Sequence, residues 1–342
     1  MRQFIIIIFI SLLGVLYVWQ GIYLPKDSYS QEEKIFLINK GEGIEEIAQH
    51  LEEEGIIKNK ALFLLYLILT RQLRNIQAGA YQLSPSMSID EIVDKLVCGK
   101  TLKEKITIIE GWRARDIALY LGKKGICTPE EFLEVVDFPK TKHSSKAMDF
   151  SDKYNFLEDK PKNVGLEGYL FPDTYFIERD MTPEEIVEMM LDNFGKKLTP
   201  ELRKEIARQG KTIFEIVTMA SLLEKEVKSL EDKKLVAGIL WKRLKIGIPL
   251  QVDATITYIT GKKTTFISKK ETEIDSPYNT YKYKGLPPAP ICNPGFESIL
   301  ASIYYKDSEY LYYLSAPDGR TIFSRTLEEH NIAKAKYLKN NN

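Results

Sequence analysis

The first half of the chain contains one short pattern three times, and this repeat restricts the possible folds more than any other feature. Residues 34–57 (KIFLINKGEGIEEIAQHLEEEGII) and 104–127 (EKITIIEGWRARDIALYLGKKGIC) each join a β-rich run, a glycine turn and a helical Ile–Ala–Leu spacing. Residues 79–100 form a weaker third copy, in which Ser88 and Glu91 have the spacing of a helix capping box. Because each strand–turn–helix copy is too short to bury its own apolar face, the repeat predicts an α+β fold whose units share a core.

The N-terminus carries an apolar run over residues 4–24, interrupted by Ser11 and Gln20. A helix needs about 20 apolar residues to cross a bilayer, so this run is long enough. Arg2 precedes it and no small-x-small cleavage site follows it, which favours an uncleaved signal anchor over a cleaved signal peptide. The sequence therefore predicts a single-pass protein of the cytoplasmic membrane, with a cytoplasmic tip at 1–3, a span at 4–24, a linker at 25–33 and an extracytoplasmic remainder.

Composition excludes several classes of function. The 48 basic residues balance 48 acidic ones, so no net field favours nucleic acid. Three distant cysteines, Cys98, Cys127 and Cys292, and three scattered histidines show neither a metal-ligand spacing nor a disulfide framework. No glycine-rich phosphate loop is present. We therefore expect no metal, no cofactor and no nucleic-acid partner.

The stretch GLEGYLFPDTY (165–175) places one acidic residue, Glu167, among glycine, apolar and aromatic side chains. A carboxyl group in apolar surroundings loses hydration, which raises its pKa and lets it hold a proton near neutral pH. That property suits a general acid. The alternative is a glutamate that caps a helix or pairs with a cation while its neighbours pack.

Further patterns occupy the second half. The run TIFEIVTMASLLEKEV (212–227) predicts a buried helix, with Glu224 near the apolar stripe and Glu226 facing water. Residues 250–258 (LQVDATITY) read as the entry to a strand, with Gln251 and Asp253 on one face.

Three segments are predicted to be loops or turns. Residues 137–156 have the composition of a long polar loop, where a substrate groove could form. The proline-rich stretch SPYNTYKYKGLPPAPICNPG (276–295) suits sugar recognition, because its tyrosine rings can stack on pyranoses and its amides can bond hydroxyls. A long structural turn is the alternative. Pro317–Asp318–Gly319 predicts a β-hairpin.

Two resemblances to known families follow from these motifs. Residues 36–57 loosely resemble a LysM module, a β-α-α-β fold that often binds peptidoglycan glycans; a packing module without sugar contact is the alternative. The ordered set LEGYLFPDTY, ASLLEKE, LQVDATITY, SPYNTYKYKGLPPAPICNPG, YLYYLSAPDG and EEHN resembles the YceG-like family of endolytic murein transglycosylases, from about residue 34 to about residue 337. The resemblance implies a LysM-like module at 34–103 and a larger mixed α/β catalytic domain at 104–342.

The resemblance also implies a reaction and a set of site residues. The family cleaves the β-1,4 bond between N-acetylmuramic acid and N-acetylglucosamine in nascent glycan strands, leaves 1,6-anhydro ends, and is thought to terminate strands beside peptidoglycan synthases. Its essential glutamate corresponds to Glu167. Residues expected to bind substrate or support the cleft are Glu224, Gln251, Asp253, Tyr278 and Asn279. The chain departs from the family pattern at Ala254, Ala289 and Thr321, where relatives commonly have Pro, Gly and His.

One carboxyl group can carry out this reaction, because the nucleophile is the C6 hydroxyl of the reacting sugar and is already tethered to it. A muramidase-type hydrolase would instead need a second carboxylate near Glu167, for which Glu224 and Asp253 are the candidates. A non-catalytic peptidoglycan-binding scaffold is the alternative from another class, and it would leave Glu167 dispensable.

Overall fold

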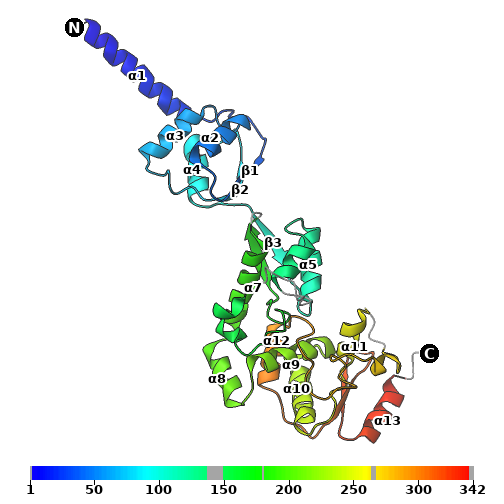
Figure 1. Ribbon diagram of the computed structural model, residues 1–342. Coiled ribbons are helices and arrows are strands. Elements are labelled where there is room, and N and C mark those ends of the chain that lie inside the picture. Colours follow the sequence, from blue (N-terminus) through cyan, green and yellow to red (C-terminus); the bar gives the residue numbers. More distant parts are fainter. Residues whose placement is uncertain (1, 137–148, 179–180, 263–266, 339–342) are drawn as a thin grey trace. The chain divides into compact units, whose positions relative to one another are not determined.

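The structure is a computed structural model that describes residues 2–136, 149–178, 181–262 and 267–338 (Figure 1). The chain forms two compact units, one of residues 1–106 with 176–181 and one of residues 107–175 with 182–342. It passes from the first unit to the second within strand β3 (Lys103–Thr107). Strand β4 (Thr174–Glu178) is hydrogen-bonded to β3 and carries the chain back to the first unit.

Besides parts of β3 and β4, the described residues of the first unit form the elements α1 (Arg2–Tyr23), β1 (Lys34–Ile38), α2 (Ile44–Glu53), α3 (Lys60–Leu69), β2 (Gly79–Leu83) and α4 (Ile89–Val97), and β1 and β2 pair antiparallel. In the pair, Lys34 lies opposite Leu83 and Ile38 lies opposite Gly79. The order β1–α2–α3–β2 is the β-α-α-β order expected for this region. That it is a LysM module stays a prediction.

All three predicted repeats are strand–turn–helix units. The turn glycines of the first two copies, Gly41 and Gly111, have φ of 85° and 80°, and the glycines after their helices, Gly55 and Gly125, have φ of 74° and 70°. Only glycine adopts this left-handed region without strain, which explains why the glycines recur. The helical residues at matching positions are all buried: Ile47, Ala48 and Leu51 in α2, and Ile117, Ala118 and Leu121 in α5 (Ala114–Lys123). In the third copy the Ser88 N–H donates to Glu91 Oε2 at 2.9 Å, as the capping spacing predicts.

Helix α1 is both a long apolar helix and a part of the first unit's core. Residues Gln3–Tyr23 are long and apolar enough to cross a membrane. Ile22 is nevertheless only 4% exposed in the core formed with α2, α3 and α4, and Val18 packs against that core. The folded unit therefore includes the last turns of the apolar helix.

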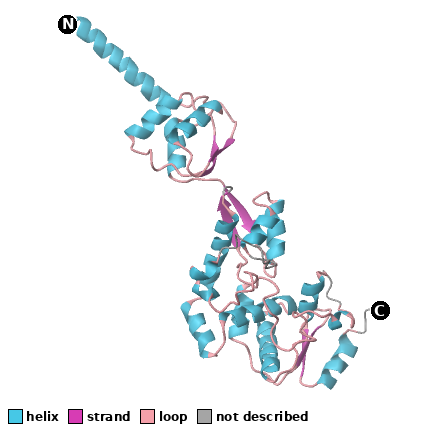
Figure 2. Ribbon diagram, viewed as in Figure 1, coloured by secondary structure: helices cyan, strands magenta, loops and turns pink. Residues whose placement is uncertain are grey.

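Helices predominate in the second unit (Figure 2). Besides α5, they are α6 (Pro129–Val135), α7 (Pro183–Lys197), α8 (Pro200–Arg208), α9 (Ile213–Glu226), α10 (Leu230–Lys245), α11 (Asp253–Thr260), α12 (Phe296–Ile303) and α13 (Leu327–Tyr337). Helix α9 is buried continuously from Ile216 to Leu223 and packs against α8, α10, α11 and α12. The predicted hairpin is confirmed as strands β5 (Tyr312–Ser315) and β6 (Thr321–Ser324).

The strand predicted at 250–258 is wrong. Residues Asp253–Thr260 form helix α11, whose two ends are held by side chains from distant parts of the sequence. At its start Ala254 N–H donates to Glu226 Oε1 at 3.2 Å. Near its end Arg113 donates to the carbonyl oxygens of Thr257 and Tyr258 at 3.3 and 3.4 Å. These contacts satisfy groups that a short helix leaves unpaired, and a local pattern does not reveal them.

The polar loop predicted at 137–156 lies in part outside the described residues. Residues 149–156 are described, and they contain two short 3₁₀ turns, Phe150–Asp152 and the start of Asn155–Leu157. Phe150 and Phe156 are buried, so this part of the segment packs on the core rather than lining an open groove.

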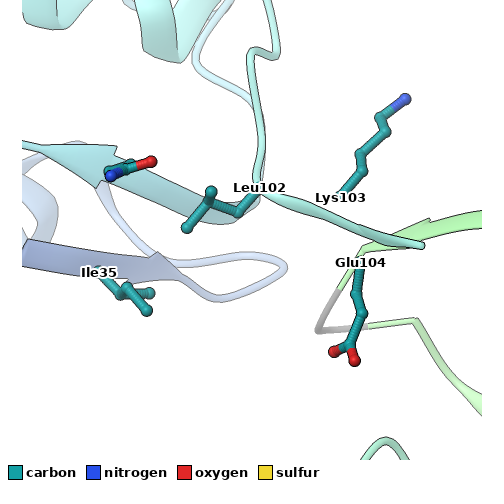
Figure 3. A pocket seen from close by; sticks show the side chains of 5 residues that line it. Ile35, Leu102, Lys103 and Glu104 are labelled. Carbon is teal, nitrogen blue, oxygen red and sulfur yellow. The ribbon is translucent and has the colours of Figure 1, made fainter. Parts of the chain in front are cut away.

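The first unit also has a pocket of about 370 Å³, lined by Ile35, Gln82, Leu102, Lys103 and Glu104 (Figure 3). Lys103 and Glu104 point to opposite sides of the chain, as successive residues of a strand do. Glu167 is not among the residues that line this pocket.

Candidate active site

Glu167 lies in a tightly packed turn of the second unit, between α6 and β4. The residue is 2% exposed. The following residue, Gly168, has φ of 96°, and a Cβ atom there would lie 2.6 Å from Pro290 and 2.8 Å from Val217. Tyr169 next anchors the turn, because its ring packs 5.3 Å from that of Phe194. The turn therefore has little freedom to move.

The carboxyl group of Glu167 receives hydrogen bonds at the start of helix α5. Ala114 N–H, at the first position of that helix, lies 2.9 Å from Oε1 and 3.1 Å from Oε2. Asn293 Nδ2 donates to Oε1 at 2.9 Å. The alternative reading of Glu167 as a helix-capping residue thus describes part of its geometry, although the helix that it caps is 53 residues away in the sequence.

Burial is the dominant electrostatic effect on Glu167 and raises its pKa to about 8. The Ala114 hydrogen bond, the charge of Arg113 and the Asn293 hydrogen bond lower the pKa, while the charge of Asp116 raises it further. With this pKa, the carboxyl group is protonated in most molecules at pH 7. The raised pKa that the apolar neighbours predict is confirmed.

Half-buried aromatic and cationic side chains lie beside this carboxyl group. The Arg113 guanidinium lies 4.8 Å from the centroid of the Tyr258 ring, and that ring lies 4.9 Å from the ring of Tyr278. Burial raises the pKa of both tyrosines, and the charge of Glu167 adds to the rise. Tyr278, an expected site residue, is therefore near Glu167, and Arg113 and Tyr258 join it.

Asn293 is a site residue that the sequence patterns did not single out. It is fully buried and contacts Glu167 from a position 126 residues later in the chain. The available signal was an asparagine before Pro–Gly at the end of an apolar run, which also fits an ordinary turn. Its backbone is fixed as well, because Asn293 N–H donates to Trp112 O and Gly111 N–H donates to Asn293 O, both at 2.8 Å.

Glu224 is occupied at the start of helix α12. Its Oε2 accepts hydrogen bonds from Gly295 N–H at 3.0 Å and from Ser298 Oγ at 2.6 Å. Lys233 Nζ lies 3.4 Å from the same oxygen. These contacts give Glu224 a supporting position, since it orders the helix that directly follows the Asn293 loop.

Gln251 and Asp253 lie at the start of α11, where both are exposed. Gln251 Oε1 accepts from Arg243 at 2.6 Å, and Asp253 accepts from the hydroxyl of Tyr281. Glu226, expected to face water, is instead half-buried between Ala254 and Tyr313, and burial with the Asp253 charge raises its pKa to about 7. The expectation for Glu226 is wrong because the start of α11 and strand β5 cover it.

Asn279 is buried inside the proline-rich loop. Its Nδ2 donates to Thr272 O at 3.0 Å and to Ile274 O at 2.7 Å, and its Oδ1 accepts from Tyr281 N–H at 3.0 Å. With these three hydrogen bonds, the Asn279 amide stabilises the backbone of the loop. In this structure Asn279 therefore supports the loop rather than presenting a free amide to a ligand.

Within the described ranges, no group of three or more His, Cys, Asp or Glu side chains could hold a metal ion. The candidate site thus consists of one buried acid, two amide donors, an arginine and tyrosine rings. This arrangement can donate and accept a proton.

Comparisons with known proteins identify the family of this chain. The pattern of the YceG-like family matches residues 36–336. An endolytic murein transglycosylase of Bacillus subtilis is 34% identical over 308 residues, which are 89% of this chain and 85% of that protein. One from Streptococcus pneumoniae strain D39 is 33% identical over 334 residues, which are 92% of this chain and 60% of that longer protein. A crystal structure of a YceG-like protein from Listeria monocytogenes is 34% identical, with a TM-score of 0.60 over 89% of this chain and all of that one. The chain belongs to the YceG-like family.

Proposed function

We propose that this chain is an endolytic lytic transglycosylase of peptidoglycan, with Glu167 as its catalytic acid and base. The observation that carries the proposal is the buried Glu167 carboxyl group, whose pKa is raised to about 8. The names of the Bacillus and Streptococcus relatives support the reaction class. The bond cleaved is the β-1,4 linkage between N-acetylmuramic acid and N-acetylglucosamine, and the product ends in 1,6-anhydro-N-acetylmuramic acid.

The reaction uses one carboxyl group twice. Protonated Glu167 gives its proton to the glycosidic oxygen while the C1–O bond breaks and an oxocarbenium-like centre develops at C1 of the muramic acid. The ionised carboxylate then takes the proton of that sugar's C6 hydroxyl as the C6 oxygen bonds to C1. Because the nucleophile is a hydroxyl group of the reacting sugar itself, its effective molarity can reach about 10⁵–10⁸ M.

Three groups stabilise the carboxylate between these two steps. Ala114 N–H and the Asn293 amide donate hydrogen bonds to it, and Arg113 supplies a nearby positive charge. All three are in place before the reaction, so little reorganisation is needed when the charge appears.

Helix α1 supports a membrane location for the enzyme. Its span is apolar, and Trp19 and Tyr23 lie at its C-terminal end, where aromatic residues suit a membrane interface. We propose that α1 anchors the chain in the cytoplasmic membrane and that the catalytic part acts outside it, on glycan strands emerging from peptidoglycan synthases.

A hydrolase is less well supported. It needs a second carboxylate that is free to activate water. Glu224 is occupied by Gly295, Ser298 and Lys233, and Asp253 accepts a hydrogen bond from Tyr281.

The test is to digest purified un-crosslinked glycan strands with the full chain in detergent and to read the new ends by mass spectrometry. We expect anhydro ends from the unmutated chain and no cleavage by Glu167→Gln. The matched control is Glu226→Gln, which changes another shielded glutamate with a raised pKa and should keep cleavage within a few-fold.

Reducing ends would assign the chain to the hydrolases. Full activity in Glu167→Gln would remove Glu167 from the mechanism. Glycan binding without any cleavage by the unmutated chain would favour the scaffold.

A further inference from the structure

We infer that Asn293 is a positioning residue for Glu167, whose amide holds Oε1 as a pure acceptor and leaves Oε2 as the oxygen that carries and transfers the proton. This inference deepens the proposed function and rests on it. It assigns a role to a residue of the proline-rich loop that touches the acid rather than the sugar.

The orientation of the Asn293 amide follows from the backbone on either side of Glu167. Asn293 Oδ1 accepts from Gly168 N–H at 2.8 Å and from Leu170 N–H at 3.0 Å. A flipped amide would point its NH₂ group at these two donors. Nδ2 must therefore face the other way, where it donates to Trp112 O at 3.0 Å and to Glu167 Oε1 at 2.9 Å. Both acceptor positions and both donor hydrogens of the amide are used.

The two oxygens of Glu167 are consequently different. Oε1 receives the Asn293 amide and the shorter contact of Ala114 N–H, at 2.9 Å each. Oε1 already accepts two hydrogen bonds, so a proton bound to Oε1 would clash with one of the two donor hydrogens. Among the residues that the structure describes, Oε2 has only the longer Ala114 contact, at 3.1 Å. The neutral acid therefore carries its proton on Oε2, and the lone pairs of Oε1 stay bound to the protein.

This arrangement serves both proton transfers. Oε2 gives its proton to the glycosidic oxygen and then takes a second proton from the C6 hydroxyl, so the carboxyl group does not need to rotate. The other titratable and charged groups facing Glu167 are Arg113 just before α5, Asp116 on α5, Tyr258 on α11, and Tyr278 and Cys292 in the loop. Of these neighbours and Asn293, it is Asn293 whose side chain donates a hydrogen bond directly to the Glu167 carboxyl group.

Two substitutions at Asn293 test the inference. Asn293→Ala removes the donor. Asn293→Asp keeps the size and can keep the bonds from Gly168 and Leu170, but it places an acid beside Oε1. A hydrogen bond to a carboxylate lowers its pKa by about 1 to 2 units, because it stabilises the ionised form. We therefore expect the pKa of Glu167 to rise by about that amount in the alanine variant. In the aspartate variant the pair titrates together, and its upper pKa should rise at least as far.

Two readouts follow the carboxyl group in the full chain in detergent. Infrared spectroscopy with ¹³C-carboxyl glutamate gives the titration, and the Glu167 band is assigned by its loss in Glu167→Gln. The alkaline limb of the kcat–pH profile should move upward in parallel, while kcat at its optimum falls about 10- to 100-fold because the carboxylate loses a preorganised donor.

Asn279→Ala is the matched control. Asn279 lies in the same loop, is also fully buried, and uses its amide only on the loop backbone. The Asn279→Ala variant should have a lower melting temperature and an unchanged pKa of Glu167.

An unchanged Glu167 titration in both Asn293 variants would overturn the inference, and so would an equal shift in Asn279→Ala. Because the infrared titration needs no substrate, it decides the role of Asn293 even if Glu167→Gln proves active and the proposed function fails.

Discussion

At Glu167, burial and hydrogen bonding act on one carboxyl group in opposite directions. Burial disfavours the ionised form, and the Ala114 and Asn293 donors favour it. The resulting pKa of about 8 leaves an acid that is protonated at rest and still able to ionise during a reaction. A fully apolar site would hold the proton too tightly, and a solvated one would lose it below neutral pH.

The first residue-scale prediction concerns stability and pH. The folded pKa of Glu167 is about 8, above the value of 4.5 for an exposed glutamate, so the folded chain binds more protons between these two pH values. The stability contribution of this group is fully present below about pH 4.5 and is lost as pH rises towards 8. Glu167→Gln does not titrate, so its melting temperature relative to the unmutated chain should increase from pH 5 to pH 8. A constant difference, measured by calorimetry, would show that the pKa is not raised.

The second residue-scale prediction concerns Gly168. Gly168→Ala must accept a positive φ and a Cβ atom within 3 Å of Pro290 and Val217, so we expect a loss of about 2–4 kcal/mol and a large loss of cleavage. Gly210→Ala is the control, because Gly210 also has a positive φ, of 66°, but no atom within 4 Å of the added carbon. It should lose only about 1 kcal/mol. Denaturant unfolding compares the two, and equal losses would mean that the Glu167 turn is not closely packed.

At the scale of elements, helix ends explain much of the site. Glu167 meets the start of α5, Glu224 the start of α12, and Glu226 the start of α11. Each carboxyl group satisfies an N–H that the helix leaves unpaired. The same interaction serves structure at Glu224 and, by our proposal, chemistry at Glu167, because only Glu167 also lies beside Arg113 and the tyrosine rings.

One element-scale prediction follows for α12. Glu224→Ala should destabilise the second unit by about 1–2 kcal/mol, because the helix start loses its acceptor and Lys233 its partner. Glu224→Gln keeps an acceptor oxygen and should lose less. Cleavage per folded molecule should fall far less than in Glu167→Gln. A complete loss of cleavage in a folded Glu224→Gln variant would make Glu224 a catalytic residue.

A second element-scale prediction follows for α1. Because Ile22 belongs to the core of the first unit, Ile22→Ala should lower that unit's stability by about 2 kcal/mol or more. Leu16→Ala, on an exposed part of the same helix, should have little effect. Hydrogen exchange at β1 and β2 measures the change. Equal exchange in both variants would show that α1 is only an anchor, and a chain shortened to begin at residue 25 would then keep its fold.

At the scale of the whole molecule, two units carry separate cores and the chain crosses between them at β3 and β4. The β-α-α-β order of the first unit is followed by a second strand–turn–helix copy, β3–α5, which supplies Arg113 and Ala114 to the site. Copies of the repeat therefore build the first unit and also place Arg113 and Ala114 beside Glu167.

The prediction at this scale is that none of the three cysteines has a functional role. All three are free, and burial raises the pKa of Cys127 to about 11 and that of the fully buried Cys292 further, so neither is a reactive thiolate. The full chain with Cys98→Ser, Cys127→Ser and Cys292→Ala should cleave glycan strands within about threefold of the unmutated rate. A folded triple variant without activity would contradict this expectation.

Local sequence patterns were enough to predict the features that depend on neighbouring residues. Glycines at positive φ and periodic apolar residues revealed the repeat units, and the Pro–Asp–Gly turn revealed the hairpin. The apolar neighbours of Glu167 indicated its raised pKa. These features follow from local backbone preferences and from the spacing of apolar residues. Both can be read from residues that are close together in the sequence.

Which distant groups meet depends instead on how the whole chain folds. Residues 250–258 alternate like a strand, yet Glu226 and Arg113 hold the ends of a helix there. Asn293 looked like part of a turn, and its contact with Glu167 spans 126 residues. Hydrogen bonds act between atoms about 3 Å apart whatever their separation along the chain, so no local pattern shows which donor will reach the acid.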